Sequence, residues 1–383
     1  MKKGWEIKKL GEVCKVIAGQ SPEGKYYNDK GEGLPFYQGK KEFTKRYIGM
    51  PSKWTTKTTK EALESDILMS VRAPVGPINF STQKICIGRG LAAIRASKLV
   101  DKEFIFNFLL KHENEIVGNT GAVFNSINKK QIEEIPIPIP PLPEQKRIVN
   151  ILDKAFAEIA QAKANAEQNL ENAKEIFESY LNGIFEKKGD DWEEKTLGEV
   201  CEIKSKLIDP KEEQYQNLIH VGAGNIVSEK GTLIDLKTAG EEKLISGKFL
   251  FDNTMVLYSK IRPYLKKVVK CNFKGLCSAD IYPLKPFSEV INKDFLFHLL
   301  LSNNFTEYAI IGSQRAGMPK VNRKHLFEYM LYYPPINEQK KIVQKLDRLQ
   351  AETKKLELVY QQKLDNLEEL KKSILQKAFN GEI

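Results

Sequence analysis

The chain has 383 residues, which is long for a single hydrophobic core and about right for two domains with connectors. Its 60 lysines and arginines against 50 aspartates and glutamates give a formal net charge of +10; this favours a polyanionic partner, although an ordinary solvated surface is the alternative. No apolar run is long enough to cross a bilayer and the N-terminus lacks the apolar core of a signal peptide, so we expect a cytoplasmic protein.

The cysteines and histidines lack the spacing of a metal site. The five cysteines form no CxxC pair and the four histidines are scattered, so we predict no metal ligands and interpret the cysteines as small core residues in a reducing compartment. The sequence also contains no GxxxxGK[ST], HExxH or GxSxG motif, and the GAG at residues 222–224 is too weak to indicate a dinucleotide site. We therefore predict no catalytic residues and no cofactor in this chain.

Residues 1–143 have the pattern of an α+β domain built from short strands. Apolar runs such as DILMSV and KICIGRGLAAI alternate with turn sequences such as PEG and RAPVGP, and a helix is predicted from Asp101 to Lys111. Residues 188–336 show the same pattern, with the runs GKFLFDNTMVLYS and KKVVKCNF and a helix from Lys293. Each segment, at roughly 140 residues, is long enough to form its own core.

The second half of the chain repeats the first in the same order. WEIKKLGEVCKV at Trp5 returns as WEEKTLGEVCEI at Trp192, and EFIFNFLL returns as DFLFHLLL. The EQK triplet at Glu144 returns at Glu338. The offsets are 187 (192 − 5), 191 (294 − 103) and 194 (338 − 144), and so small a drift indicates a duplication with short loop insertions.

A proline-rich segment and then a long helix follow each domain. The run IPIPIPPLP at residues 135–143 cannot be helical or a central strand because proline lacks an amide donor, so we predict a stiff spacer that leaves the domain. Helical periodicity begins directly afterwards and predicts a helical spacer over residues 144–187, and its repeat predicts a second over residues 337–383.

The two predicted helices carry the same apolar seam. Both contain two successive four-residue steps, Ala162 to Leu170 in the first and Leu356 to Leu364 in the second, and alanines of the first helix correspond to leucine or tyrosine in the second. Because a small-faced helix packs closely against a large-faced one, we predict an antiparallel coiled coil; two helices that each dock on their own domain are the alternative. The predicted fold class is α+β, with two similar globular domains separated by this helix pair. The predicted seam residues are Ile148, Leu152, Ile159, Leu170, Ile342, Leu346, Leu356 and Leu364.

Loops in both domains are candidates for nucleic-acid contacts. In the first domain FYQGKKEFTKRY interleaves basic and aromatic residues. A second loop, SVRAP, and its counterpart YSKIRPYLKK follow apolar runs, and Arg72 is interpreted as repeated in Arg262 before a proline. A third predicted loop in each domain is NTGAVFNSINKK from Asn119 and GSQRAGMPKVNRK from Gly312. Arginine to guanine and lysine to phosphate are common contacts of such loops, and a solvated surface charge is the alternative for any one residue. The predicted DNA-binding residues of the first domain are Lys40, Lys41, Arg46, Ser70, Arg72, Asn125, Ser126, Lys129 and Lys130. Those of the second are Ser259, Lys260, Arg262, Tyr264, Lys266, Gln314, Arg315, Asn322, Arg323 and Lys324.

Taken together, these features resemble the DNA-specificity subunit of type I restriction–modification systems. The resemblance rests on the W…LGEV openings of both domains, the boxes PPLPEQKRIVNILD and PPINEQKKIVQKLD, and the helices behind them. The endings LNG at residues 181–183 and FNG at residues 379–381 also match. The resemblance covers the whole chain.

This resemblance implies a non-catalytic subunit. Its two target-recognition domains, residues 1–143 and 188–336, would read the two halves of a split, asymmetric site on double-stranded DNA. The helical spacers, residues 144–187 and 337–383, would set the distance between the half-sites and bind two methyltransferase subunits, with motor–nuclease restriction subunits completing the complex. S-adenosylmethionine is expected on the methyltransferase partner.

Two other hypotheses compete with this one. The first is a coiled-coil adaptor whose basic domains bind protein or RNA. The second, the recognition part of a fused restriction–methylation enzyme, is not favoured because we expect no catalytic segment on either side of the chain.

Overall fold

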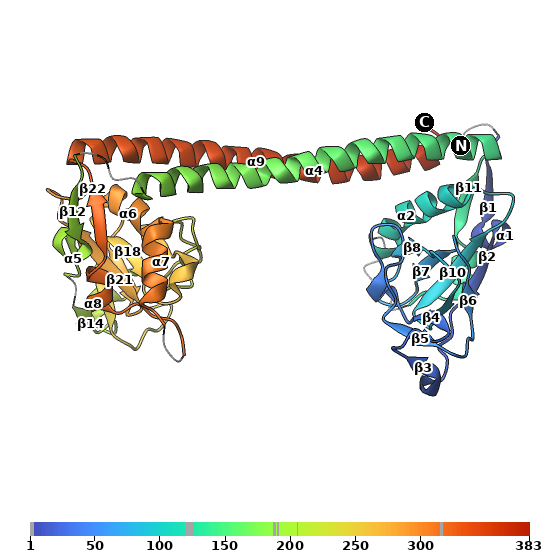
Figure 1. The fold of residues 1–383 in the computed structure, drawn as a ribbon, viewed down its shortest axis with the longest axis horizontal. Helices are drawn as coiled ribbons and strands as arrows, with labels where there is room; N and C mark the ends of the chain where they lie inside the picture. The colour runs from blue at the N-terminus through green and yellow to red at the C-terminus, as the bar shows by residue number, and fades with distance from the viewer. Residues whose placement is uncertain (1–3, 119–125, 187–188, 190, 205, 315–316) are drawn as a thin grey trace. The chain divides into compact units, whose positions relative to one another are not determined.

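The computed structural model describes residues 4–118, 126–186, 189, 191–204, 206–314 and 317–383 (Figure 1). The chain divides into two compact units: Met1–Glu167 with Gln362–Ile383 form the first, and Gln168–Gln361 form the second. Each unit holds one α+β domain and a stretch of each long helix, α4 Leu142–Glu186 and α9 Ile336–Asn380. None of the helices within the described ranges has the length and apolar character needed to cross a membrane.

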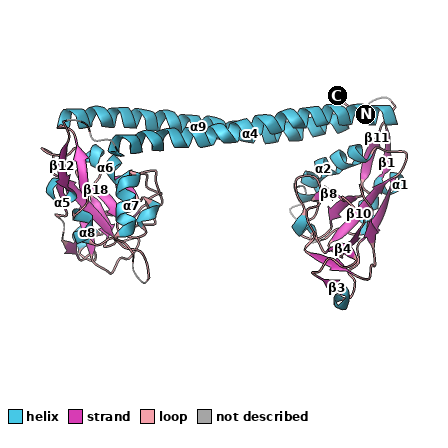
Figure 2. Cartoon of the chain, in the orientation of Figure 1, coloured by secondary structure: helices cyan, strands magenta, loops and turns pink. Residues whose placement is uncertain are grey.

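The domain of the first unit contains three sheets (Figure 2). One is four-stranded and antiparallel in the order β2-β10-β7-β8, one is five-stranded and mixed in the order β3-β5-β4-β9-β6, and one pairs β1 with β11. The strands are β1 Glu6–Lys9, β2 Cys14–Ala18, β3 Tyr27–Asn28, β4 Leu34–Tyr37, β5 Lys53–Thr55, β6 Glu61–Ala62, β7 Ile67–Ser70, β8 Ile78–Phe80, β9 Ile85–Ile87, β10 Leu91–Ala96 and β11 Pro136–Ile139. The helices are α1 Leu10–Val13, α2 Lys102–Gly118 and α3 Lys129–Glu133, with 3-10 turns η1 Gly24–Tyr26 and η2 Lys40–Glu42.

The domain of the second unit repeats the four-stranded and two-stranded sheets, whereas its five-stranded sheet carries one edge strand, β14, on the opposite edge from β3 of the first domain. Its sheets have the orders β13-β21-β18-β19, β14-β17-β20-β15-β16 and β12-β22. The strands are β12 Glu193–Thr196, β13 Cys201–Glu202, β14 Leu207–Ile208, β15 Ile219–Val221, β16 Lys237–Thr238, β17 Lys248–Phe251, β18 Val256–Ser259, β19 Val268–Lys270, β20 Gly275–Ser278, β21 Ile281–Pro286 and β22 Met330–Tyr333. The helices are α5 Leu197–Val200, α6 Lys293–Leu301, α7 Asn303–Ile311 and α8 Arg323–Phe327, with 3-10 turns η3 Glu213–Tyr215 and η4 Pro263–Leu265.

The proline-rich segment is part of a sheet rather than a free spacer. Pro136 to Ile139 form β11, which pairs antiparallel with β1 so that Pro138 faces Ile7 and Pro136 faces Lys9. In an antiparallel pair only every second residue exchanges its amide with the partner strand. Prolines at alternate positions of a two-stranded sheet therefore cost no ladder bond, and the segment ties the start of α4 to the first strand of its domain.

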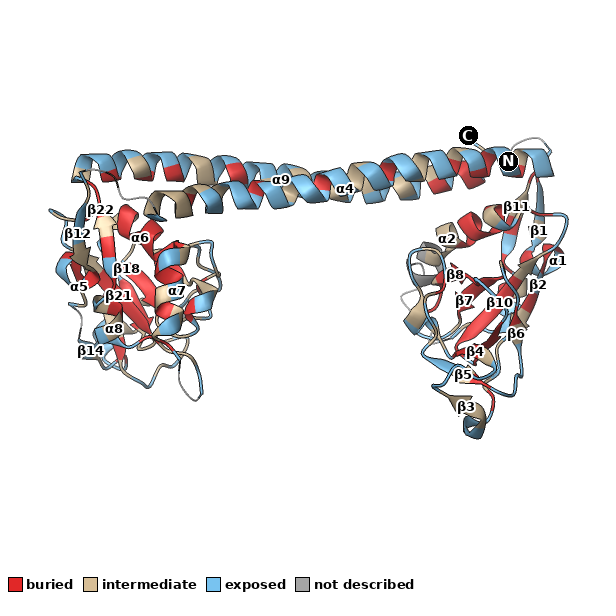
Figure 3. Cartoon of the chain, viewed as in Figure 1, coloured by how far each residue is buried: buried red, intermediate tan, exposed pale blue. Residues whose placement is uncertain are grey.

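Each unit has a core that includes both long helices (Figure 3). In the first unit, Ile148 and Leu152 of α4 and Leu375 and Phe379 of α9 join the cluster formed by α2 and the four-stranded sheet. In the second unit, residues of both helices join the equivalent cluster around α6. The five-stranded sheets enclose smaller cores of their own. Each long helix therefore contributes residues to the cores of both units.

The two long helices pair in opposite directions. Near the start of α4, the Arg147 guanidinium donates to the backbone oxygen of Ile383 at 2.6 Å, and further along Lys163 lies 2.6 Å from Glu368. Near the end of α4, the Lys345 ammonium of α9 lies 5.1 Å from the centre of the Tyr180 ring. Residue numbers that rise along α4 meet numbers that fall along α9, which confirms the predicted fold class of two α+β domains joined to an antiparallel helix pair.

The predicted seam residues differ in how far they are buried. Ile148, Leu152, Ile159 and Leu346 are buried, and Ile342, Leu170 and Leu364 are partly buried, whereas Leu356 is 41% exposed. Thr353 is buried instead, and its hydroxyl donates to the Gln350 carbonyl at 3.1 Å. Because a threonine can satisfy its hydroxyl on the preceding turn, the seam passes through Thr353 and turns Leu356 away from the partner helix.

Candidate nucleic-acid interface

In the first unit, the loop after β7 exposes Arg72 and buries Ser70. The Ser70 hydroxyl lies 3.2 and 3.1 Å from two backbone carbonyls of its own loop, so its proton is used inside the loop. Arg72 forms a backbone bridge with Ser126, and the Ile127 amide donates to the Val71 carbonyl at 3.0 Å. The third predicted loop therefore runs beside the second and supports the backbone from which the Arg72 side chain reaches the surface.

The loop after β18 in the second unit has the same backbone plan. Ser259 is buried and its hydroxyl donates to the Ile261 carbonyl at 3.4 Å. Ile261 bridges Lys320, and the Val321 amide donates to the Lys260 carbonyl at 2.8 Å. In both units the serine hydroxyls satisfy loop carbonyls, so we leave Ser70 and Ser259 out of the proposed interface.

These bridges show that Arg72 and Arg262 are not structural counterparts. The two buried serines differ by 189 positions (259 − 70), which places Arg72 opposite Ile261 and Ala73 opposite Arg262. Our interpretation of Arg262 as a repeat of Arg72 is therefore wrong by one residue. The backbone bridges fix which residues of the two loops correspond. The sequence comparison had instead aligned the two arginines because each precedes a proline.

Arg262 and Tyr264 lie on a turn with an unusual backbone. Arg262 and Lys266 flank η4 with φ angles of 50° and 44°, a left-handed conformation that costs a non-glycine residue on the order of 1–3 kcal/mol. The Arg262 amide donates to the Pro319 carbonyl at 2.9 Å, and the Lys266 ammonium donates to the Asn303 side chain on α7 at 2.6 Å. The Lys266 charge is thus already bonded, and the turn leaves Arg262 exposed and Tyr264 50% exposed.

Two exposed methionines near these loops were not predicted. Met50 is 87% exposed and Met318 is 51% exposed. Met318 directly precedes Pro319, whose carbonyl accepts the Arg262 amide, so it lies next to η4. Each methionine stands in a GMP triplet, at residues 49–51 and 317–319, but these triplets are 268 positions apart (317 − 49) and are not counterparts in the duplication.

The basic residues around η2 divide into exposed and anchored ones. Lys40 and Lys41 are exposed on η2. The Arg46 guanidinium pairs with Glu103 and lies 5.7 and 5.2 Å from the ring centres of Phe80 and Phe106. Partial burial raises the pKa of the Glu103 carboxyl, and the charge of Arg46 opposes that rise. Arg46 therefore links this loop to α2, and we leave it out of the proposed interface.

Lys260 is likewise engaged within its own domain. Its side chain is 12% exposed and its ammonium donates to the Ala279 carbonyl. The same ammonium lies 3.8 Å from Asp280 and 5.0 Å from the centre of the Tyr282 ring. These contacts leave little of its charge for a phosphate.

A separate group of predicted residues lies on or beside the short helices α3 and α8. Lys129 and Lys130 are exposed, and Lys129 lies 3.4 Å from Glu133. On α8, Arg323 donates to a backbone carbonyl at 3.1 Å, whereas the Lys324 side chain is 87% exposed and lies 3.8 Å from Glu328.

The remaining predicted residues have mixed placements. Asn322 caps α8 by accepting the His325 amide at 2.8 Å. Ser126 and Gln314 are exposed. Asn125 and Arg315 lie outside the described residues.

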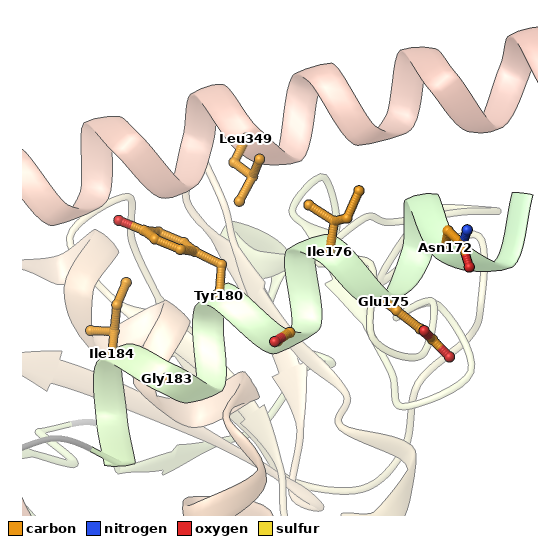
Figure 4. A pocket seen from close by; sticks show the side chains of 8 residues that line it. Asn172, Glu175, Ile176, Tyr180, Gly183, Ile184 and Leu349 are labelled. Carbon is orange, nitrogen blue, oxygen red and sulfur yellow. The ribbon is translucent and has the colours of Figure 1, made fainter. Parts of the chain in front are cut away.

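An open groove lies beside the paired helices of the second unit (Figure 4). The side chains of Ile176, Tyr180 and Ile184 line it along α4, and Leu349 faces it from α9. Ile176 is 48% exposed. Asn172, Glu175 and Ser179 also line it, so the groove combines apolar side chains with polar ones.

The residues described include neither a cluster of metal ligands nor an exposed cysteine thiol. No group of three or more His, Cys, Asp or Glu residues there is placed to hold a metal ion. All five cysteines are buried, and burial raises the pKa of Cys14 and Cys201 to about 12.

Comparison with known proteins identifies the family. The family model described as the type I restriction modification DNA specificity domain matches residues 2–172 and again residues 189–369. The chain is 28% identical over 413 aligned positions to the type I restriction enzyme EcoDI specificity subunit of Escherichia coli, covering 99% of this chain and 88% of that protein. It is 46% identical over 175 residues to the MjaX specificity subunit of Methanocaldococcus jannaschii, where the match covers 44% of this chain and 40% of that protein.

Two solved structures share the fold. One comes from work on complex assembly and conformational transition of the type I R-M system, with a TM-score of 0.80 at 18% identity and coverage of 100% of this chain and 99% of that one. The other is the HsdS subunit from Thermoanaerobacter tengcongensis, with a TM-score of 0.65 at 19% identity and coverage of 100% and 98%. With two copies of the specificity domain in its sequence, this chain belongs to the family of type I restriction–modification DNA-specificity subunits, which are non-catalytic.

Proposed function

We propose that the two domains read the two halves of a split, asymmetric site on double-stranded DNA, and that the paired helices set the distance between the halves. The observation that carries this proposal is the duplication itself: two domains whose four-stranded sheets have equivalent orders present different loops. A pair of like domains on one helix pair suits a DNA site made of two unlike parts with a fixed spacer.

Within this proposal, Arg72 reads one half-site and Arg262 the other. Both side chains are exposed on loops whose backbones are tied to a neighbouring loop. A guanidinium can bind the O6 and N7 atoms of guanine with two hydrogen bonds. Tyr264 and Met318, exposed next to Arg262, add apolar contacts of the kind that fit a thymine methyl group or a base step.

The exposed lysines supply the sequence-independent part of binding. Lys40, Lys41, Lys129, Lys130 and Lys324 are exposed, and the net charge of the chain is +10. Neutralised phosphates make affinity fall steeply with salt. We therefore assign phosphate contacts, rather than base contacts, to these residues and to the Gln314 and Asn322 side chains beside the second-domain loops.

We further propose that methyltransferase subunits dock on the helices, with two such subunits and the motor–nuclease subunits completing the restriction complex. The exposed apolar residues of the groove support this, because an uncovered apolar face on a helix pair is suited to a partner helix. S-adenosylmethionine would be bound by the methyltransferase. Under this proposal the chain selects the DNA site, and the partner subunit carries out the methyl transfer.

The test is to express the chain with its methyltransferase partner in a host that lacks other adenine methylation, and to sequence the modified sites. We expect one bipartite motif with a constant spacer. A continuous motif, or no motif with the partner present, would contradict the proposal. Binding of the complex to RNA or to a protein, without preference for duplex DNA, would favour the adaptor hypothesis instead.

A further inference from the structure

The duplicated EQK triplet places one fully buried glutamine at the start of each long helix. In the first unit this is Gln145, and none of its surface is exposed. Its side-chain oxygen accepts the Asp101 amide at 2.8 Å, and its side-chain nitrogen donates to the carbonyls of Pro140 at 2.9 Å and Leu99 at 3.5 Å. One side chain therefore joins α4, the turn before α2 and the end of β11.

Gln339 repeats this arrangement in the second unit. It is also fully buried. Its oxygen accepts the Asn292 amide at 2.8 Å, and its nitrogen donates to the carbonyls of Val290 at 3.0 Å and Pro334 at 2.8 Å. The partners differ from those in the first unit by 191, 191 and 194 positions (292 − 101, 290 − 99 and 334 − 140), which are the offsets of the duplication. Every contact is kept, although the partner residues are not all identical.

The backbone amide that donates to each glutamine oxygen belongs to a residue whose side chain caps the start of a helix in the domain. Asp101 accepts the amides of Glu103 and Phe104 at the start of α2, and Asn292 does the same for α6. The glutamine thus fixes the first turn of a long helix to the first turn of the helix packed beneath it. Three hydrogen bonds to three separate backbone groups restrict the orientation of the helix more than a single contact does.

The packing around each glutamine does not define that orientation by itself. Ile148 and Leu152 pack α4 onto the core of its domain, but apolar contact is non-directional and tolerates small shifts of a helix over a surface. Hydrogen bonds weaken steeply away from straight geometry, and a buried amide left without partners is costly. The polar contacts therefore select one angle among those that the apolar packing allows.

We propose that Gln145 and Gln339 are positioning residues that fix the angle between each recognition domain and the helix pair, and so make the complex selective for one spacer length. This inference rests on the proposed function, because it assigns these residues to the spacer rather than to either half-site. Neither glutamine contacts DNA under this proposal.

The experiment uses the full chain in complex with its methyltransferase and duplexes in which the two half-sites are separated by the native spacer or by one or two base pairs more or fewer. The variants are Gln145→Met and Gln339→Met, which keep side-chain length and remove the hydrogen bonds. We expect each variant to keep both half-site sequences while its preference for the native spacer falls by roughly tenfold, a change of ~1.4 kcal/mol.

A matched control separates positioning from general loss of stability. Ile85→Val removes one methyl group from the distal core of the first domain, where Ile85 is fully buried, and does not touch the glutamine contacts. It should lower the melting temperature without changing spacer preference. Unchanged spacer preference in both glutamine variants would overturn the inference, and so would an equal change in the control. Failure of the wild-type complex to show any preferred spacer would instead refute the proposed function.

Discussion

The two units share a scaffold and differ in the loops that it carries. The four-stranded sheets have the equivalent orders β2-β10-β7-β8 and β13-β21-β18-β19, and both glutamines make the same three contacts. The loops after β7 and β18 begin with the same buried serine and then diverge. Arg72 is the second residue after the serine of the first loop. Arg262 is the third residue after the serine of the second loop and has a left-handed backbone conformation. The scaffold has thus been kept while the candidate reading surface has changed.

A second difference lies where each domain meets its helices. In the second unit the fully buried His298 of α6 lies 3.1 Å from Asp347 of α9. The repeat position in the first unit, 191 residues earlier, is Asn107, also fully buried, whose side-chain amide has no protein partner among the residues described. The two domains therefore share the glutamine contacts to their helices, and among the residues described only the second has the further polar contact at this position.

The largest effect is expected from lengthening the helix pair. Inserting four residues after Ala166 and four after Leu364 adds about 6 Å, the rise of roughly two base pairs. We expect methylation of the native site to be lost and a site with a longer spacer and unchanged half-sites to be gained, as measured by sequencing of modified DNA. The substitution Glu167→Ala, which adds no length, is the control. An altered half-site sequence would show that the helices do more than set a distance.

Core substitutions at repeat positions should act on one unit each. Leu152 and Leu346 are both fully buried, so Leu152→Ala and Leu346→Ala should each cost about 2–5 kcal/mol of unfolding free energy, measured by chemical denaturation. Leu356→Ala, at a position 41% exposed, should cost much less. If Leu356→Ala destabilised the chain as much as Leu346→Ala, the seam described through Thr353 would be incorrect.

Removing either exposed arginine should weaken the reading of one half-site only. Each lost bidentate contact to guanine should cost about 1–3 kcal/mol of discrimination, in the first half-site for Arg72→Ala and in the second for Arg262→Ala. Binding competition with duplexes altered in one half-site measures this. Lys324→Ala, which removes an exposed charge from α8, should lower affinity for all sequences alike. The same loss in both half-sites for either arginine variant would break the proposed division of labour.

The smallest effect concerns pH. The Asp347 carboxyl has a pKa below the ordinary 3.8, chiefly because of its hydrogen bond to His298. The contribution of this pair to stability is therefore present above about pH 3.8 and is lost as pH falls through the lower folded-state value. Because the Asp347 side chain is 51% exposed, we expect less than about 1 kcal/mol. Thermal melts of wild type and Asp347→Asn should differ at pH 6 and converge as the pH falls below 3.8.

Asp153→Asn is the matched control in the first unit, since Asp153 is the repeat position of Asp347 and Asn107 replaces the histidine there. It should show no such convergence. A pH dependence of equal size in both variants would mean that the comparison between the units is mistaken at this position.

Hydrophobic periodicity and the internal repeat were sufficient to predict the architecture, because they reflect local backbone preferences that the tertiary structure did not override. The short strands of both domains and the two long helices appear where their patterns indicate. Sequence patterns failed where a choice depended on a partner at a distance. The proline segment is a strand because β1, far away in the sequence, lies beside it.

The candidate interface was less predictable for the same reason. The sequence around a basic loop residue looks the same whether its charge is exposed to solvent or paired with another group of the protein. Arg46 and Lys260 are engaged by Glu103 and by a backbone carbonyl from a distant strand turn, whereas Lys40 and Arg72 are exposed. Met50 and Met318 were missed because an exposed apolar side chain is not distinguished in sequence from a buried one.

By itself the sequence determined that this chain is a duplication with two α+β domains and two long helices, since those properties follow from spacing along the chain. The tertiary structure decided which charges remain at the surface and what the EQK triplets do. A buried glutamine that binds three backbone groups from two other segments has no local signature, because hydrogen-bond partners are brought together only when the chain folds.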